Sequence, residues 1–103
     1  FRHAPGHYAE LCIPEIALLE WHPFTIASAP PSPGEDGELT FYIKALGRWT
    51  TSLFDLAGGP EGSLRRVRLR GPFGAPAQNY QAYRHLVVIG SGIGVTPLLA
   101  VWE

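Results

Sequence analysis

Three glycines at alternate positions follow an apolar run near the end of the chain. The run occupies residues 86–89, and residues 90–97 after it read Gly-Ser-Gly-Ile-Gly-Val-Thr-Pro. Glycines let backbone N–H groups approach a pyrophosphate closely, and a helix N-terminus that follows them favours negative charge. The usual dinucleotide fingerprint would place its third glycine where this chain has Val95. The segment is therefore a candidate phosphate-binding turn, and a structural tight turn is the alternative.

A second segment carries groups that suit a flat ring ligand. Residues 21–30 read Trp-His-Pro-Phe-Thr-Ile-Ala-Ser-Ala-Pro, which predicts a strand with a proline near its start. A strand offers backbone N–H and C=O groups to the edge of a planar ring such as a flavin, and Thr25 and Ser28 add hydroxyls. The rings of His22 and Phe24 could flank such a ligand. The alternative is an edge strand in which His22 satisfies a local hydrogen bond.

Length and composition limit the chain to one small domain at most. It has 103 residues, of which 46% are hydrophobic, and its 12 glycines and 10 prolines favour strands and turns over helices. The net charge of −1 gives no argument for nucleic-acid binding, and no apolar run approaches the length of a membrane span. The one cysteine, Cys12, excludes an internal disulfide and is expected to be a small core residue. The histidines lack metal-ligand spacing, so no metal site is predicted.

Four strands and one short helix are predicted ahead of the glycine turn. The strands cover residues 8–13, 21–28, 39–46 and 64–70, and the helix covers residues 50–57, with hydroxyl side chains at its start as cap candidates. The elements that must position the two candidate binding segments are therefore mostly strands.

Alternation and turn residues refine these elements. The apolar face of the strand at 39–46 consists of Leu39, Phe41, Ile43 and Ala45. In the strand at 64–70, Val67 and Leu69 are expected to face inward. Three arginines share the other face of that strand, as a solvated row or a row facing a phosphate or a partner: Arg66, Arg68 and Arg70.

The last third of the chain is predicted to form a loop and then a strand followed by a helix. Residues 71–84 are predicted to form a loop, and residues 86–89 a strand buried on both faces of a parallel sheet. A helix is predicted to begin at Val95. The chain starts without Met and ends inside this predicted helix, so we expect it to be a piece of a longer protein. We also expect one or two strands of the barrel to lie upstream of this piece.

Five segments, in the same order along the chain, resemble one known family. Residues 20–30 resemble the flavin-binding signature of the NADPH oxidase family, which belongs with ferric-chelate reductases and ferredoxin-reductase-like flavoproteins. Residues 5–8 resemble its Pro-Gly-Gln-Tyr turn, with His7 in place of Gln. Residues 47–54 resemble its Gly-x-Trp-Thr segment. Residues 71–74 resemble the loop that follows in the family, and residues 90–97 resemble its pyridine-nucleotide turn.

The resemblance implies roles for residues that match the family motifs. The segment beginning at His22 would hold the isoalloxazine and ribityl part of FAD, Trp49 and Thr50 would lie near its phosphates with Lys44, and residues 90–97 would hold the NADPH pyrophosphate. No catalytic residue is predicted. The predicted cofactor-binding residues are His22, Pro23, Phe24, Thr25, Ile26, Ser28, Lys44, Trp49, Thr50, Gly90, Ser91, Gly92, Ile93, Gly94, Val95, Thr96 and Pro97.

The resemblance also implies a fold and a function. The fold would be mainly β, a partial antiparallel Greek-key barrel of ferredoxin-reductase type over residues 1–84, followed at 85–103 by the first strand and turn of an α/β NADPH-binding domain. The function would be the cytosolic flavin module of a membrane NADPH oxidase. Electrons would pass from NADPH through FAD to haem in the membrane domain of the same protein, and then to dioxygen to form superoxide. The alternatives are a ferric-chelate reductase module and a non-catalytic FAD-binding or docking module.

Overall fold

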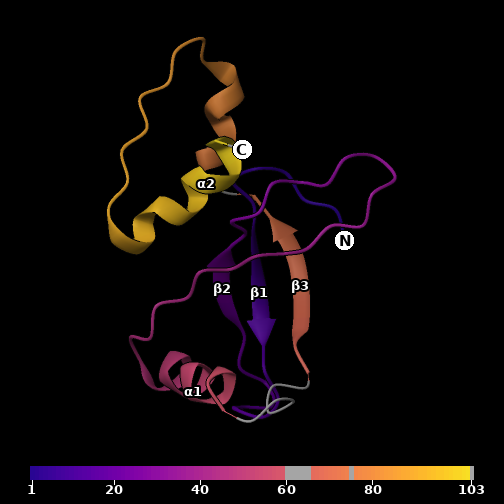
Figure 1. The fold of residues 1–103 in the computed structure, drawn as a ribbon, viewed down its shortest axis with the longest axis vertical. Helices are drawn as coiled ribbons and strands as arrows, with labels where there is room; N and C mark the ends of the chain where they lie inside the picture. Colours follow the sequence, from indigo (N-terminus) through magenta and orange to yellow (C-terminus); the bar gives the residue numbers. More distant parts are fainter. Residues whose placement is uncertain (60–65, 75, 103) are drawn as a thin grey trace.

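The computed structural model describes residues 1–59, 66–74 and 76–102. One antiparallel sheet forms the centre, with α-helix α1 at one end and the C-terminal helices at the other (Figure 1). The elements in chain order are β1 (Tyr8–Cys12), β2 (His22–Thr25), α1 (Arg48–Ala57), β3 (Arg68–Phe73), the 3₁₀ helices η1 (Pro76–Ala82) and η2 (Gly92–Val95), and α2 (Thr96–Trp102). The predicted class, a mainly antiparallel β fold that forms part of a barrel, is confirmed.

The sheet has the order β2-β1-β3, so β2, which carries the predicted flavin-binding residues, is an edge strand. On β1, Tyr8 is opposite Thr25 of β2, and Leu11 is opposite His22. Because side chains alternate along a strand, Leu11 and His22 share one face of the sheet, while Tyr8 and Thr25 share the other. Alternation therefore decides which residues of β2 can act together, and the register shows which of them lie beside Leu11 of the core.

The core lies on the face that α1 covers. Leu11, Ile13 and Trp49 form its buried cluster. The partly buried residues that pack against this cluster are Ile16, Phe24, Phe41, Ile43, Leu53, Leu56 and Leu69. Trp49, at the start of α1, therefore attaches the helix to the sheet.

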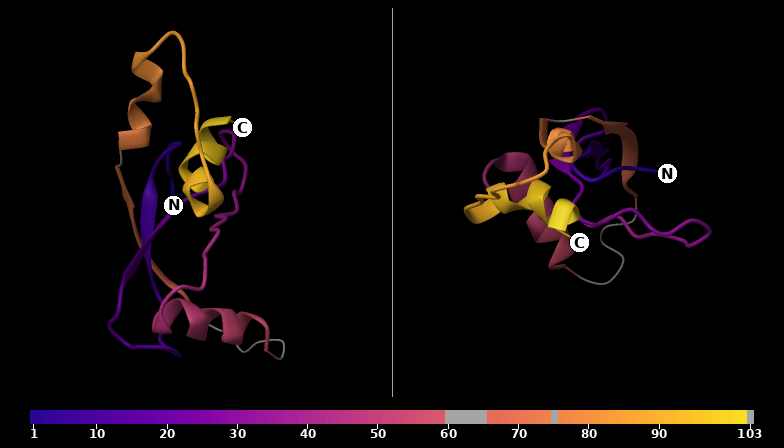
Figure 2. Two further views of the ribbon diagram at one scale, coloured as in Figure 1. Left: turned by 90° about the vertical axis from the view of Figure 1, so that its left-hand side faces the viewer. Right: turned by 90° about the horizontal axis from the view of Figure 1, so that it is seen from above.

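The segment at 39–46 differs from its prediction as a strand. Phe41 and Ile43 do pack on the core, as their alternation predicted, but the segment forms no strand. Figure 2 shows it running beside the sheet. Its beginning is hydrogen-bonded to the β2 side, where the Ala27 N–H donates to the Thr40 carbonyl (2.8 Å) and the Thr40 N–H donates to Ser28 Oγ (3.1 Å). The hydrophobic pattern thus correctly predicted which side chains face the core. The segment lacks the ladder of backbone hydrogen bonds that would make it a strand.

The predicted buried strand at 86–89 is also wrong. These residues form no strand, and Val87 and Ile89 are 89% and 87% exposed. A strand in a parallel sheet needs neighbouring strands and helices on both faces. Instead, Leu86 and its neighbours line a shallow groove together with residues of η1 and α2.

Smaller corrections concern element ends. Strand β3 begins at Arg68 and continues to Phe73, inside the predicted loop, and residues 64 and 65 of the predicted strand lie outside the described residues. Val67 is 50% exposed, but it lines an apolar groove with Leu69 and the core residue Leu11, so both side chains lie on the predicted side. The rest of the predicted loop contains η1. None of the helices in the described ranges has the length and apolar character needed to cross a membrane.

Candidate cofactor site

Two rings on β2 stack against the core tryptophan of α1. The centroids of the His22 and Trp49 rings are 4.3 Å apart, and those of Phe24 and Trp49 are 5.7 Å apart. The interplanar angles are 33° and 22°. His22 and Phe24 can both reach Trp49 because they are two residues apart on one strand and therefore share a face. The structure thus brings together three of the predicted flavin-binding residues.

Two polar atoms in this cluster have no hydrogen-bond partner among the residues that the structure describes. They are His22 Nε2 and Trp49 Nε1, and both are buried. Leaving such a group unsatisfied costs about 1–3 kcal/mol, which makes it a sign of a missing partner. The Trp49 N–H can only donate, and the His22 ring nitrogen donates when it carries the ring proton. Because both atoms are buried, a ligand rich in oxygen acceptors, such as a phosphate or a ribityl chain, would satisfy them only after the side chains around them moved aside.

Pro23 and Thr25 lie on the opposite face of the sheet. With Tyr8 and Glu10 they line a shallow groove of about 260 Å³. A flat ligand on one face of β2 therefore contacts alternate side chains of the predicted segment, and His22 and Thr25 cannot both contact it from the same side.

The backbone of β2 has a second, outer edge. The Ile26 N–H donates to the His7 carbonyl (3.1 Å), toward β1, and the next N–H, that of Ala27, reaches Thr40 on the other side. By the same alternation, the Thr25 N–H lies on this outer edge. Thr25 thus offers a backbone donor at the edge and a hydroxyl on the outer face, which is the combination expected of a residue that binds the rim of a ring.

Other predicted residues are buried or hydrogen-bonded within the protein itself. Ile26 is 1% exposed, and Ser28 Oγ accepts the Thr40 N–H. Thr50 Oγ1 accepts the N–H groups of Leu46 (2.9 Å) and Gly47 (3.0 Å). The Thr50 hydroxyl therefore closes the first turn of α1. The donors left at that helix end are backbone N–H groups, which have no intrahelical partner in the first turn.

The predicted phosphate-binding turn forms the 3₁₀ helix η2, which leads directly into α2. In η2 the Gly94 N–H donates to the Ser91 carbonyl (3.1 Å), and the Thr96 hydroxyl donates to the Ile93 carbonyl (2.7 Å). Gly92 has a φ of +54°, in the left-handed region that favours glycine. A Cβ at the first glycine of the turn, residue 90, would lie 3.1 Å from the Cα of residue 95, so the turn packs closely there.

The structure does not bring this turn to the His22–Trp49 pair. Figure 1 shows α1 at one end of the sheet and α2 at the other. Because β2 runs from His22 to Thr25, its last residue lies toward the α2 end. Lys44, another predicted binding residue, is exposed in the segment before α1.

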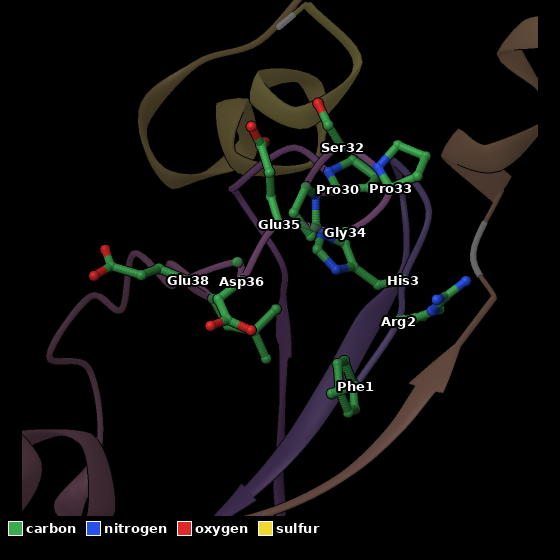
Figure 3. Close-up of a pocket in the computed structure, with 13 residues that line it drawn as sticks. Phe1, Arg2, His3, Pro30, Ser32, Pro33, Gly34, Glu35, Asp36 and Glu38 are labelled. Carbon is green, nitrogen blue, oxygen red and sulfur yellow. The ribbon is translucent and has the colours of Figure 1, made fainter.

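A larger cavity lies away from all these residues. It has a volume of about 620 Å³ between the first three residues and the proline-rich loop at 30–39 (Figure 3). The His3 Nε2–H donates to the Ser28 carbonyl (2.9 Å) and ties the two walls together. Sequence reasoning identified this stretch only as a loop, because proline and glycine content predicts a turn without predicting what its walls enclose.

Comparisons with known proteins agree on the first three quarters of the chain. Residues 1–77 match the family model described as an FAD-binding domain. Over 98% of its length the chain is 41% and 36% identical to two heavy chain subunits of superoxide-generating NADPH oxidase from Dictyostelium discoideum. It is 36% identical to respiratory burst oxidase homolog protein F of Arabidopsis thaliana, again over 98% of its length. The chain spans 16%, 21% and 12% of these three relatives, in that order.

Proposed function

Because the chain belongs to the FAD-binding domain family, we propose that it is the flavin module of a membrane NADPH oxidase. The resemblance to NADPH oxidases that the motifs indicated is confirmed by the relatives. In this proposal electrons pass from NADPH through FAD to haem in a membrane domain of the same protein, and then to dioxygen. The module lies on the cytosolic side. The names of the relatives favour this function over the ferric-chelate reductase alternative.

One observation carries the proposed FAD site: two buried nitrogens without partners, in stacked rings at the start of α1 and on β2. Trp49 Nε1 and His22 Nε2 would donate to oxygens of the cofactor. The N-terminal N–H groups of α1 would add donors to a phosphate beside them, since a helix N-terminus favours negative charge. Lys44 would contribute positive charge from the segment before the helix.

The other end of β2 suits the ring. Thr25 carries an edge N–H and an outer-face hydroxyl, and it lies toward α2. When bound, FAD would accept a hydride and release electrons one at a time, which no side chain can do. The chain would hold the ring at Thr25, with Pro23 packing beside it. An extended cofactor that reached from Thr25 to Trp49 would have to pass the outer edge of β2, because the two residues lie on opposite faces of the sheet.

The second cofactor is assigned to the turn at 90–97. Gly92 provides the left-handed residue, and the closely packed glycine at 90 brings the backbone near the start of α2. We assign residues 1–84 to the FAD-binding domain and residues 85–103 to the start of the NADPH-binding domain. The first range holds the sheet, α1 and η1, which packs against α2, and the second range holds η2 and α2 (Figure 1).

The cofactor itself tests the proposal. We expect FAD, and not FMN, in the protein that carries residues 1–103, because the α1 end of the site provides phosphate-binding donors some distance along β2 from the ring-binding end. Mass spectrometry of the cofactor released from the purified protein distinguishes the two. FMN as the sole species would contradict the proposed site.

Thr25→Ala is expected to weaken FAD binding more than Ser32→Ala. Loss of one hydrogen bond to the ligand costs about 0.5–1.5 kcal/mol, a factor of about 2 to 13 in Kd. Ser32 is the matched hydroxyl control, because it is exposed in the proline-rich loop and lines the other cavity (Figure 3). Titration of the apoprotein with FAD measures both variants. Equal affinities would contradict the assignment of Thr25.

A further inference from the structure

One residue connects the flavin strand to η1, the helix that precedes the nucleotide turn. His7 lies just before β1, and its carbonyl accepts the Ile26 N–H at the end of β2 (3.1 Å). Its ring nitrogen Nε2 lies 2.8 Å from the side-chain amide of Gln78 in η1. The two residues are far apart in sequence, so this contact joins the start of the sheet to the segment that leads into the second proposed domain.

The hydrogen bonds of His7 fix its protonation and tautomer. The Ala4 N–H donates to His7 Nδ1 (2.9 Å), which must therefore be unprotonated. The proton of the neutral ring then lies on Nε2, and Nε2–H donates to the amide of Gln78. The atom of Gln78 that faces it must be the carbonyl oxygen Oε1, since two donors cannot pair and amide orientation follows from the hydrogen-bond network. His7 is thus held by a backbone donor on one side and holds η1 on the other.

The surroundings of the contact restrict the Gln78 side chain. A Cβ at Gly74 would lie 2.8 Å from the outer end of the Gln78 side chain, so the glycine leaves space for the amide. Nearby, the rings of Tyr8 and Phe73 are in contact with centroids 5.2 Å apart, which holds the end of β3 against the start of β1. The helices η1 and α2 are in contact and line one groove, so we expect a movement of η1 to be passed on to α2.

We propose that the His7–Gln78 hydrogen bond sets the position of the nucleotide-binding turn relative to the flavin strand. His7 and Gln78 are positioning residues: they touch neither cofactor, and they act through η1 and α2. Hydride transfer requires the reacting atoms to be held about 3–3.5 Å apart, so a small shift between the two units lowers the rate of transfer. The inference rests on the proposed function of both units.

The test compares four variants in the FAD-loaded protein that carries residues 1–103. His7→Ala and Gln78→Ala should each lower kcat/KM for NADPH about three- to ten-fold, with the Kd for FAD unchanged. The double variant should be no worse than either single one, because the two residues act through one bond. His7→Gln should restore wild-type values, since a glutamine can accept from Ala4 and donate to Gln78.

Two further variants separate the contact from general damage to η1. Gln81→Ala, in the same helix, is the matched control, because Gln81 is exposed and bonds only to its neighbour Tyr80 among the contacts of the described residues. It should leave kcat/KM unchanged. Gly74→Ala should reproduce Gln78→Ala, because its methyl group displaces the amide without touching His7.

A distance measurement tests the inference without either cofactor. Spin labels at Asp55 of α1 and Trp102 of α2, both exposed, report the position of one unit against the other, and the native Cys12 is too buried to be labelled. His7→Ala should broaden the distance distribution, and His7→Gln should not. An unchanged distribution in His7→Ala, or failure of His7→Gln to restore it, would overturn the inference.

Failure of the proposed function has a different signature. If the wild-type protein neither binds FAD nor oxidises NADPH, the proposed function is wrong, and the label distances alone then decide whether His7 holds η1. If the wild type is active and the effects of His7→Ala and Gln78→Ala multiply in the double variant, the inference is wrong while the proposed function stands.

Discussion

Trp49→Ala is expected to cause the largest loss of stability of any single substitution proposed for this chain. Trp49 is 6% exposed, belongs to the core cluster with Leu11 and Ile13, and stacks on His22 and Phe24. Truncating a buried aromatic residue to alanine costs about 3–5 kcal/mol, from lost burial and from the cavity that remains. Because Trp49 attaches α1 to the sheet, the loss should be concentrated in that helix.

Native-state hydrogen exchange of the α1 peptide measures this effect within a larger protein. At about 1.4 kcal/mol per factor of ten, its amides should exchange about two to three and a half orders of magnitude faster in Trp49→Ala. Trp102→Ala is the matched control, since Trp102 is 86% exposed and its truncation should change little. Similar exchange rates in the two variants would show that Trp49 does not hold the helix.

Trp49→Phe separates packing from cofactor binding. Phenylalanine keeps most of the buried ring but lacks the indole N–H, one of the two buried nitrogens without a partner. We expect FAD affinity to fall about 2- to 13-fold, for one lost hydrogen bond, while exchange in α1 changes far less than in Trp49→Ala. Unchanged FAD affinity would remove Trp49 Nε1 from the site.

Residues 1–103 produced by themselves are expected not to oxidise NADPH faster than free FAD does. Val87 and Ile89 are almost fully exposed, and the segment at 86–89 has no sheet to join within the described residues. A nicotinamide must be held within reach of the flavin for hydride transfer, and a rigid α/β unit normally provides that support. The chain spans only 12–21% of the relatives to which it is similar, which leaves ample chain in them for such a unit.

Steady-state NADPH absorbance checks this expectation, with FAD added in excess. Free FAD at the same concentration is the control for uncatalysed oxidation. Saturable oxidation that depends on the chain would show that residues 1–103 hold the nicotinamide by themselves, and the assignment of 85–103 to a partial domain would then be wrong.

The parts that the sequence predicted well depend on short-range patterns. Strands β1 and β2 lie within the predicted ranges, and α1 begins at Arg48, two residues before its predicted start. The alternation of Phe41 and Ile43 predicted their burial against the core, because a two-residue period needs no knowledge of the partner strand. The predicted hydroxyl N-cap, by contrast, is wrong: the N-cap is Gly47, and the Thr50 hydroxyl, three residues further on, accepts the Gly47 N–H.

The parts that failed depend on partners far away in the chain. An apolar run such as 86–89 indicates a buried strand only if neighbouring strands are available, and its composition does not say whether they are. Alternation along β2 already puts His22 and Thr25 on opposite faces, but which of the two faces meets the core follows from the pairing of His22 with Leu11 and from Trp49, which the motif alone does not give. Two contacts were invisible for the same reason: the His7–Gln78 bond and the stacking of Trp49 on β2 join segments that sequence analysis treated separately.

The burial of Cys12 makes it a native reporter of how the sheet opens. It lies on β1, the central strand, with no exposed surface, and its thiol points to the Leu18 carbonyl (Sγ to O, 3.4 Å). As the sole cysteine, it gives any thiol reagent a single target in the chain. Modification of Cys12 therefore requires β1 to separate from its cover, and the reaction rate measures the population of that opened state.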